Sequence, residues 1–202
     1  MKKISFVFLL FIGFAFLSCN SYNNGTKSEV DNKKKVIVTH SKGFTISDLG
    51  DIKSIDILQP YPNAKETFSY KITSSKSLIS NDILFSPVQK IVVSSTTHIP
   101  MLELLDAENS LVGFQNTEYI SSPKTRKRID QGFVKELGNK GALNMEVLLD
   151  INPDLVVGFA MTSNSKVYNS VEKANIPVIL NGDWLEETPL GRAEWIKFFG
   201  VL

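Results

Sequence analysis

The stretch "PDLVVGFAMTSNSKVYNSVEKANIPVIL", residues 153–180, contains one complete strand–helix–strand pattern. Its ends lie in two predicted strands, Pro153–Ala160 and Ile176–Asp183, whose continuous apolar centres are typical of strands buried on both faces. The segment between them places three apolar residues at helical spacing, with Val167, Val171 and Ala174 expected to face inward. Links this short between strand and helix predict right-handed crossovers and a parallel sheet.

The same alternation of strands and helices extends upstream to residue 88. Strands are predicted at Lys90–Ser95 and Leu111–Asn116, with a helix between them in "HIPMLELLDAE", residues 98–108. We expect Met101, Leu104 and Leu105 to form the buried face of that helix. The fold class is therefore α/β, a Rossmann-like parallel-sheet lobe, and ligands of such sheets bind beyond the carboxyl ends of the strands.

A polar loop and a second helix complete the lobe. The loop is expected over residues 117–132, and the helix lies in "ALNMEVLLDI", residues 142–151, with Asn144 as its N-cap. The inner face of this helix is expected to hold Met145, Leu148 and Leu149. The loop carries a basic cluster of Lys124, Arg126, Lys127 and Arg128, which is either a solvated surface or an attractor of an anionic ligand.

Residues 36–87 have a different sequence pattern. Apolar and polar residues alternate in short runs, and no stretch has helical periodicity. Strands are predicted in "VIVTH", "FTISDL", "SIDILQP", "FSYKIT" and "ILFSP", separated by Gly, Asn, Pro and Ser turn signals. This segment is interpreted as a β-meander that precedes the α/β lobe.

The first 35 residues indicate export. Residues 1–18 pair an N-terminal Met-Lys-Lys with a short apolar run, the pattern of a secretory signal peptide. Cys19 is the single cysteine of the chain, and Phe16-Leu17-Ser18-Cys19 resembles a bacterial lipobox, which implies that lipid is attached to Cys19. Residues 19–35 are polar and are expected to tether the lipid to the domain. The alternative is a plain secreted protein with an incidental cysteine.

The final segment, residues 188–202, is predicted to be one helix. Trp195, Phe198, Phe199 and Leu202 fall at helical spacing, and the pattern stops without a cap. A helix with this many apolar residues needs a further part of the protein to pack against. We therefore expect that the sequence is truncated here.

Composition and the absence of known motifs argue against several classes of function for this chain. The chain has 202 residues and a formal net charge of +1, which gives no strong field to recruit nucleic acid. No G-x-S-x-G, H-E-x-x-H, C-x-x-C or Walker pattern occurs in the sequence. We therefore expect a protein that is not an enzyme, with no cofactor, no metal site and no nucleic-acid partner.

The sequence has "NME" at 144–146, followed by "NPDLVV" at 152–157. With this motif as the most specific piece, the chain from residue 88 onward resembles the N-terminal lobe of substrate-binding proteins that serve ABC importers of iron-siderophores, haem and cobalamin, the Fe/B12 periplasmic-binding class. Residues 36–87 resemble the extension of Bacteroidetes-type lipoprotein members. The resemblance implies two α/β lobes joined by a long helix. Residues 88–187 would then be the first lobe and residues 188–202 the start of the joining helix, while the second lobe is missing.

Several residues are functional candidates, each with a plainer alternative. Glu146 matches the family's glutamate that docks onto the permease subunits, or it is an ordinary first-turn glutamate. Ligand-binding candidates follow the strands at their carboxyl ends, and the alternatives are helix capping, surface loop or packing roles. They are Thr96, Thr97, His98, Gln115, Tyr119, Phe159 and Trp184.

These observations predict a lipid-anchored binding protein in the cell envelope. It would work as a monomer, hold a ferric chelate, haem or cobalamin, and deliver it to the permease of an ABC importer. The alternative is an envelope interaction or adhesion module built around the β-rich segment, or a non-functional fragment without a small-molecule ligand.

Overall fold

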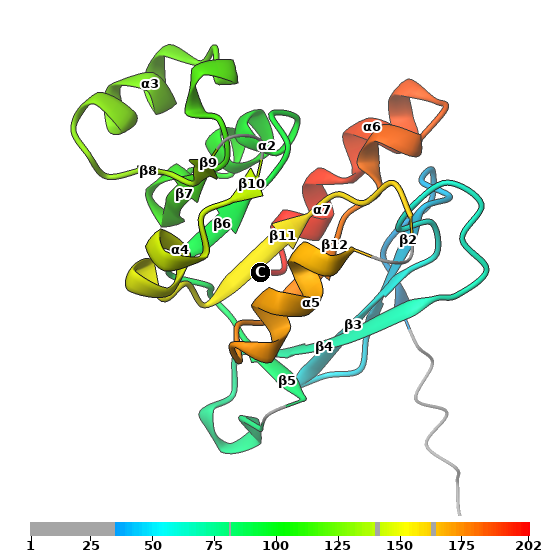
Figure 1. The fold of residues 1–202 in the computed structure, drawn as a ribbon. Helices are drawn as coiled ribbons and strands as arrows, with labels where there is room; N and C mark the ends of the chain where they lie inside the picture. Colours follow the sequence, from blue (N-terminus) through cyan, green and yellow to red (C-terminus); the bar gives the residue numbers. More distant parts are fainter. Residues whose placement is uncertain (1–34, 81, 140–141, 163–164) are drawn as a thin grey trace, which may run out of the picture. The chain divides into compact units, whose positions relative to one another are not determined.

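The computed structural model describes residues 35–80, 82–139, 142–162 and 165–202, which belong to one compact unit. The predicted signal peptide, Cys19 and nearly all of the predicted tether lie outside these residues. Two five-stranded sheets and one two-stranded hairpin make up the strands of the described chain (Figure 1). No helix in these described ranges is long and apolar enough to cross a membrane.

The second five-stranded sheet confirms the predicted α/β class. Its strands are β6 (Ile91–Val93), β7 (Leu111–Phe114), β8 (Lys135–Glu136), β11 (Leu155–Gly158) and β12 (Val178–Leu180). All pairs are parallel and the order is β12-β11-β6-β7-β8. The chain thus starts in the middle, adds β7 and β8 on one side, and then adds β11 and β12 on the other. The order reverses between β6 and β11, which makes this junction the topological switch point.

Helices cover both faces of this sheet (Figure 1). They are α2 (His98–Leu104), α3 (Pro123–Asp130), α4 (Met145–Ile151), α5 (Lys166–Lys173), α6 (Pro189–Glu194) and α7 (Ile196–Phe199). Four 3-10 turns join them: η1 (Lys76–Leu78), η2 (Glu108–Ser110), η3 (Thr117–Tyr119) and η4 (Asp183–Leu185). Side chains alternate between faces, so Val92 and Val156 pack with α4 and α5, whereas Val93 and Val157 pack with α2 and α7.

The predicted N-cap of α4 is confirmed, because the Asn144 side chain accepts a hydrogen bond from the Val147 N–H at 3.2 Å. The buried faces of three helices differ from expectation. Leu104 is 74 % exposed in α2, Leu149 is 49 % exposed in α4 and Val167 is 42 % exposed in α5.

In two of these helices, α2 and α5, other positions pack inward instead. Ile99 and Leu102 face the sheet in α2, and Tyr168 packs inward in α5. Each of these helices has at most eight residues and carries apolar side chains on more than one side. Periodicity therefore allows two registers, and packing against the sheet selects one of them.

The polar loop predicted over 117–132 is wrong, because it contains η3 and the helix α3. Ser122 caps α3 by accepting a hydrogen bond from the Thr125 N–H at 3.3 Å, and Pro123 occupies the first helical position. The basic cluster makes local contacts: Lys124 pairs with Glu108 at 2.7 Å, and Arg126 donates to the Thr117 carbonyl at 2.7 Å. A hairpin of β9 (Gly138–Asn139) and β10 (Ala142–Leu143) follows, which the sequence pattern did not indicate.

The β-rich segment forms the first five-stranded sheet, in the order β1-β2-β3-β4-β5. Its strands are β1 (Lys35–Val36), β2 (Phe44–Asp48), β3 (Ile52–Ile57), β4 (Phe68–Thr73) and β5 (Ile83–Phe85). The first four pair antiparallel, as a meander requires, but β5 pairs parallel to β4. The meander prediction is therefore wrong for the last strand.

The segment 188–202 is two helices, α6 and α7, that meet at Trp195. Trp195 and Phe198 are fully buried in a core that also contains Phe44 and Ile46 of the first sheet and Val93 and Val157 of the second. The aromatic side chains that suggested a missing partner are thus covered by the β-rich segment. That segment and the α/β part share one hydrophobic core, although they were predicted as separate regions.

Candidate functional site

The order of the parallel strands brings most of the predicted ligand-binding residues to one edge. Residues that follow β12, β11, β6 and β7 lie side by side beyond the carboxyl ends of these strands, because neighbouring parallel strands end at the same edge. We call this set the carboxyl edge. It comprises Thr96, Thr97, Gln115, Tyr119, Phe159, Met161 and Trp184.

Apolar and hydroxyl groups are accessible on this edge. Tyr119 is 67 % exposed, Met161 61 % and Phe159 40 %. Thr96 and Thr97 are also exposed, whereas Gln115 is half-buried. Exposed aromatic rings beside hydroxyl groups can stack on a flat ligand and donate hydrogen bonds to its oxygens.

His98 occupies a different environment from the other candidates. Its side chain is fully buried, its ring lies 5.3 Å from that of Phe199, and its Nε2 is 3.7 Å from the Asp183 carboxylate. Neither ring nitrogen has a hydrogen-bond partner within the described residues. Burial raises the pKa of Asp183, but the interactions with His98, Thr97 and the Trp184 backbone outweigh it and lower this pKa. The structure therefore places His98 beneath the edge, facing Asp183.

Trp184 lies in η4 directly after Asp183 and is half-buried. The Nε1 atom of Trp184 is buried, with no hydrogen-bond partner in the described part of the chain. Asn181 is fully buried, and its Oδ1 accepts a hydrogen bond from the Asp183 N–H at 2.8 Å. The end of β12 is thus held by internal polar contacts, and it presents only part of the Trp184 ring at the edge.

Sequence reasoning missed two residues at the switch point, Ser94 and Tyr168. The Tyr168 hydroxyl donates to the Phe159 carbonyl at 3.0 Å and to the Ser94 Oγ at 3.2 Å. The Ser94 Oγ in turn accepts a hydrogen bond from the Phe159 N–H at 2.9 Å. Burial raises the pKa of the Tyr168 hydroxyl, despite the opposing effect of these hydrogen bonds. The ring lies so close to Gly158 that a Cβ there would fall 2.3 Å from Tyr168 Cζ.

Tyr168 thus fills the crevice between β6 and β11 and fixes the backbone of Phe159. A ligand at this edge would lie above the phenol ring, on the exposed side chains, and not between the strands. The signal that could have found this contact is Gly158 at the end of a strand, since glycine at such a position often marks a close approach by another group.

Glu136 fixes the loop that carries Gln115 and Tyr119. Its carboxylate accepts hydrogen bonds from the Asn116 N–H at 2.8 Å and from the Thr117 N–H at 2.7 Å. Burial raises the pKa of Glu136, but the bonds from Thr117, Gly138 and Asn116 prevail and lower it. Because the carboxylate holds the loop, Tyr119 projects from an ordered backbone.

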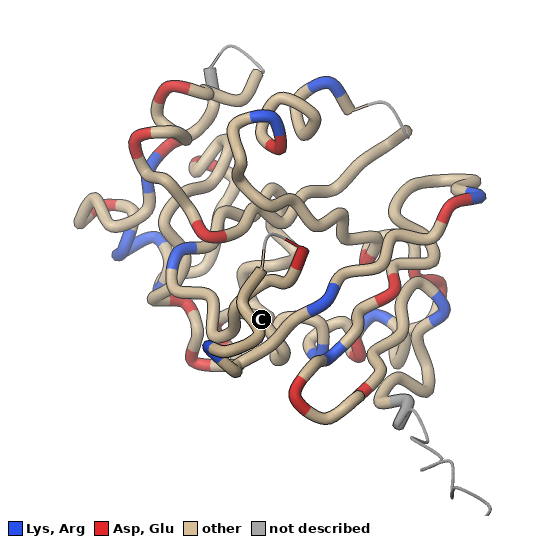
Figure 2. The backbone as a smooth tube through the Cα atoms, turned by 90° about the horizontal axis from the view of Figure 1, so that it is seen from below, with Lys and Arg blue, Asp and Glu red and all other residues tan. Residues whose placement is uncertain are grey.

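Charge does not single out the carboxyl edge. Lys and Arg residues are interspersed with Asp and Glu residues along the described chain (Figure 2). Glu146 is exposed in the first turn of α4, next to the hairpin β9–β10. Among the described residues, no group of three or more His, Cys, Asp and Glu side chains could hold a metal ion.

No family model matches the chain. Two proteins of Methanocaldococcus jannaschii described as uncharacterized lipoproteins are similar to 57 % of it, with identities of 24 % and 28 %. A further uncharacterized protein of that organism is 26 % identical over 56 % of the chain. These matches cover 29 %, 30 % and 35 % of the relatives, so the chain spans about a third of the length of the curated relatives that it matches.

Two solved structures are also similar. The periplasmic heme binding protein HutB of Vibrio cholerae is 19 % identical and has a TM-score of 0.42, covering 55 % of this chain and 40 % of that one. A periplasmic binding protein from Veillonella parvula is 17 % identical and has a TM-score of 0.44, covering 67 % of this chain and 40 % of that one.

Proposed function

We propose that this chain is part of a lipid-anchored substrate-binding protein that captures a ferric chelate, haem or cobalamin at its carboxyl edge. The observation that carries the proposal is the set of exposed side chains beyond β11, β6 and β7. Tyr119 and Phe159 offer aromatic surface, and Thr96 and Thr97 offer hydroxyl groups beside it. All three ligand classes combine a broad apolar or aromatic body with polar groups at its rim.

The rigidity of this edge supports the proposal. Glu136 orders the loop before Tyr119, and Tyr168 orders the backbone at Phe159. A binding surface that is already ordered loses less conformational entropy when the ligand arrives. The work of such a protein is capture and release, so no step needs a bond to be formed or broken.

The place of action is proposed from the N-terminal sequence and from the relatives. The signal pattern and Cys19 predict lipid attachment after export. Two similar proteins are themselves named lipoproteins. We place the chain in the cell envelope, where it would hand its ligand to an ABC importer through the exposed Glu146. A second lobe would supply the other wall of the cleft.

The test is an equilibrium titration of the purified full chain with hemin, cyanocobalamin and a ferric tris-catecholate. We expect saturable binding of one of these probes. The double variant Tyr119→Ala, Phe159→Ala should raise its Kd about thirtyfold, because each of the two rings contributes on the order of 1 kcal/mol by stacking.

The matched control is Phe133→Ala, which removes an aromatic ring that is 59 % exposed and lies before β8, away from the carboxyl edge. It should leave the Kd unchanged. The proposal fails if none of the three probes binds, or if Phe133→Ala weakens binding as much as the double variant does.

A further inference from the structure

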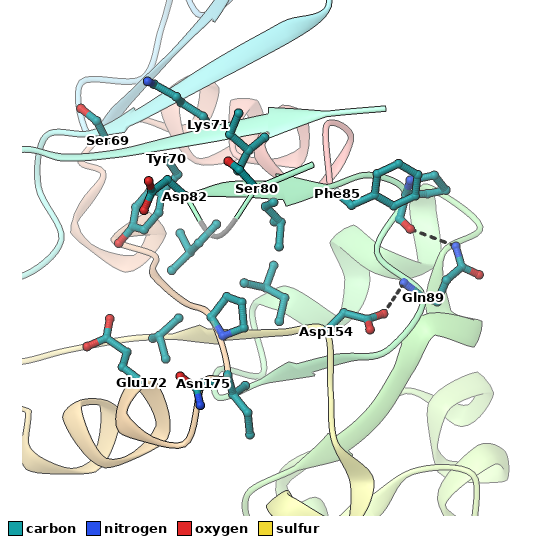
Figure 3. Close-up of a pocket in the computed structure, with 18 residues that line it drawn as sticks. Ser69, Tyr70, Lys71, Ser80, Asp82, Phe85, Gln89, Asp154, Glu172 and Asn175 are labelled. Carbon is teal, nitrogen blue, oxygen red and sulfur yellow. Dashed lines mark hydrogen bonds between the residues drawn. The ribbon is translucent and has the colours of Figure 1, made fainter. Parts of the chain in front are cut away.

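A groove of about 1270 Å³ lies between the two five-stranded sheets, near the amino ends of β11 and β12 (Figure 3). One wall is formed by β4 and β5 of the first sheet, and the other by β12, the start of β11 and the end of α5. In Figure 3, Tyr70 and Asp82 lie on the first wall and Glu172 and Asn175 on the second, with apolar side chains between them. The volume exceeds the range of about 300–1,000 Å³ that is typical of small-molecule pockets.

The groove runs along the edges of two sheets. β5 is the last strand of the first sheet and β12 the last strand of the second. Consecutive residues line it on both sides, Ile83–Phe85 from β5 and residues 176–179 at β12. Because consecutive side chains of a strand point to opposite faces, a groove that touches all of them follows the edge of the strand.

Among the described residues these edges lack a strand partner, although Ile83 of β5 forms an isolated bridge with Ser80, whose carbonyl accepts a hydrogen bond from the Ile83 N–H at 3.1 Å. Unpaired N–H and C=O groups of an end strand are a template for another strand, and many proteins bind extended peptides in this way. A single added strand could pair with either wall.

Tyr70 closes one end of the groove. Its side chain comes from β4, and its hydroxyl interacts with the backbone of Leu180 at the end of β12. Burial is the main cause that raises the pKa of Tyr70 to about 12, and the charge of Glu172 adds to the effect. The bridge leaves Val178 and Ile179 as the part of β12 that faces the open groove.

The charged side chains along the groove favour a partner that carries basic residues. Asp82 and Glu172 are exposed on opposite walls, and Lys71 is the one basic side chain among the lining residues. Asp154 also lines the groove, but its carboxylate accepts hydrogen bonds from the Gln89 and Lys90 N–H groups at 3.0 and 2.8 Å. The lining is therefore acidic around an apolar floor, whose accessible part includes the half-buried residues Ile83, Leu84 and Phe85.

We propose that this groove binds an extended segment of a partner protein, in which apolar residues alternate with lysine or arginine. The segment would add a strand to β5 or β12, place apolar side chains on the floor and direct its basic side chains to Asp82 and Glu172. This interaction does not rest on the proposed chelate binding, which concerns the opposite edge of the sheet.

The probe is a fluorescently labelled acetyl-Lys-Val-Lys-Val-Lys-Val amide, titrated against the full chain by anisotropy. We expect saturable binding, and slower hydrogen exchange at the amides of Ile83–Phe85 or Val178–Ile179. The double variant Asp82→Lys, Glu172→Lys should raise the Kd about tenfold, because two exposed charge pairs become repulsive. Asp51→Lys reverses an exposed charge outside the groove and should leave the Kd unchanged.

Four results would overturn the proposal. The first is no binding of this peptide, and the second is equal binding of the charge-reversed variant when circular dichroism shows that it is folded. The third is protection of the same amides without peptide that grows with protein concentration, which would assign the edges to self-association. The fourth is protection of these amides by hemin or cyanocobalamin, which would assign the groove to a small molecule. The outcome of the chelate titration at the carboxyl edge does not bear on this proposal, and the outcome of the peptide titration does not bear on chelate binding.

Discussion

The carboxylate of Glu194 accepts hydrogen bonds from both the backbone N–H and the hydroxyl of Thr39, at 2.9 and 3.2 Å, although 155 positions separate these residues. The same carboxylate accepts bonds from the backbone N–H groups of His40 and Ser41. Glu186 binds the adjacent N–H groups of Lys42 and Gly43 at 2.9 and 2.7 Å. Two buried carboxylates of the C-terminal region therefore fasten the loop that enters β2.

This arrangement predicts a pH-dependent stability. Burial raises the pKa of Glu194, but Lys197 and the three backbone N–H groups outweigh it and bring the pKa down from 4.5 to about 2. A lowered pKa in the folded state means that the contribution is complete above pH 4.5 and is lost as the pH falls toward 2. We expect Glu194→Gln to lose about 1–2 kcal/mol at pH 7, after allowance for solvent screening, and to lose less on acidification than the parent chain.

Urea unfolding between pH 7 and pH 2 measures this effect. The control is Glu187→Gln, which removes an exposed carboxylate from the neighbouring segment. If Glu194→Gln and the parent chain lose stability in parallel over this range, the carboxylate does not fasten the loop.

The indole of Trp195 tests whether the two sheets fold as one unit. Its ring lies 4.3 Å from that of Phe44 and is fully buried. We expect Trp195→Ala to lower the free energy of unfolding by about 3–5 kcal/mol, because it leaves a large cavity. Hydrogen exchange should accelerate together at Ile55 in β3 and at Val157 in β11.

Leu190→Ala is the control for this experiment, because Leu190 is 61 % exposed in α6 and its loss creates no buried cavity. Faster exchange in β3 with unchanged exchange in β11 would contradict a shared core.

Gly158 controls the geometry of the switch point. A methyl group there would fall 2.3 Å from Tyr168 Cζ, so Gly158→Ala must displace the phenol ring. We expect a loss of about 1–3 kcal/mol in thermal or urea unfolding and a changed near-ultraviolet tyrosine signal. Gly200→Ala is the matched control, since the nearest atom would lie at an ordinary 3.5 Å. An unchanged tyrosine signal in Gly158→Ala would show that Tyr168 does not occupy the crevice.

The proposed docking through Glu146 predicts that one variant loses transport but keeps ligand binding. Glu146→Lys should abolish uptake of the bound chelate by cells while leaving its Kd unchanged, because Glu146 lies outside the carboxyl edge. The reason is that reversal of an exposed rim charge repels a basic docking surface. Glu187→Lys reverses another exposed charge and should leave uptake intact. Normal uptake by Glu146→Lys would remove this residue from the docking surface.

The sequence predicted those features that depend on local chemistry. The limits Phe68–Thr73 of β4 match the expected strand, and the Asn144 cap of α4 is confirmed. The start of α3 carried the same kind of signal in Ser122 and Pro123, but its charged residues favoured a loop. Likewise, four strands of the parallel sheet were predicted because burial on both faces leaves largely apolar runs. The fifth, β8, consists of the exposed residues Lys135 and Glu136 and was not predicted.

What the sequence could not predict depends on contacts between distant residues. The inward side of α2 is chosen by the sheet and not by its own periodicity, so Leu104 was assigned to the wrong face. The parallel pairing of β5 with β4, the Tyr168 contact at Gly158 and the cover that Phe44 gives to Trp195 all join segments far apart in the chain. Alternation and capping patterns report only on neighbours within a few residues.

The shared core has a consequence for the order of events during synthesis. The strands β2 and β3 leave the ribosome early, but Trp195 and Phe198, which cover them, emerge more than a hundred residues later. Until then the inner faces of these strands lack these two partners, because the partners have not yet been synthesised. The first sheet cannot complete its core until the C-terminal helices are available, and such a delay would keep the chain competent for the export that we propose.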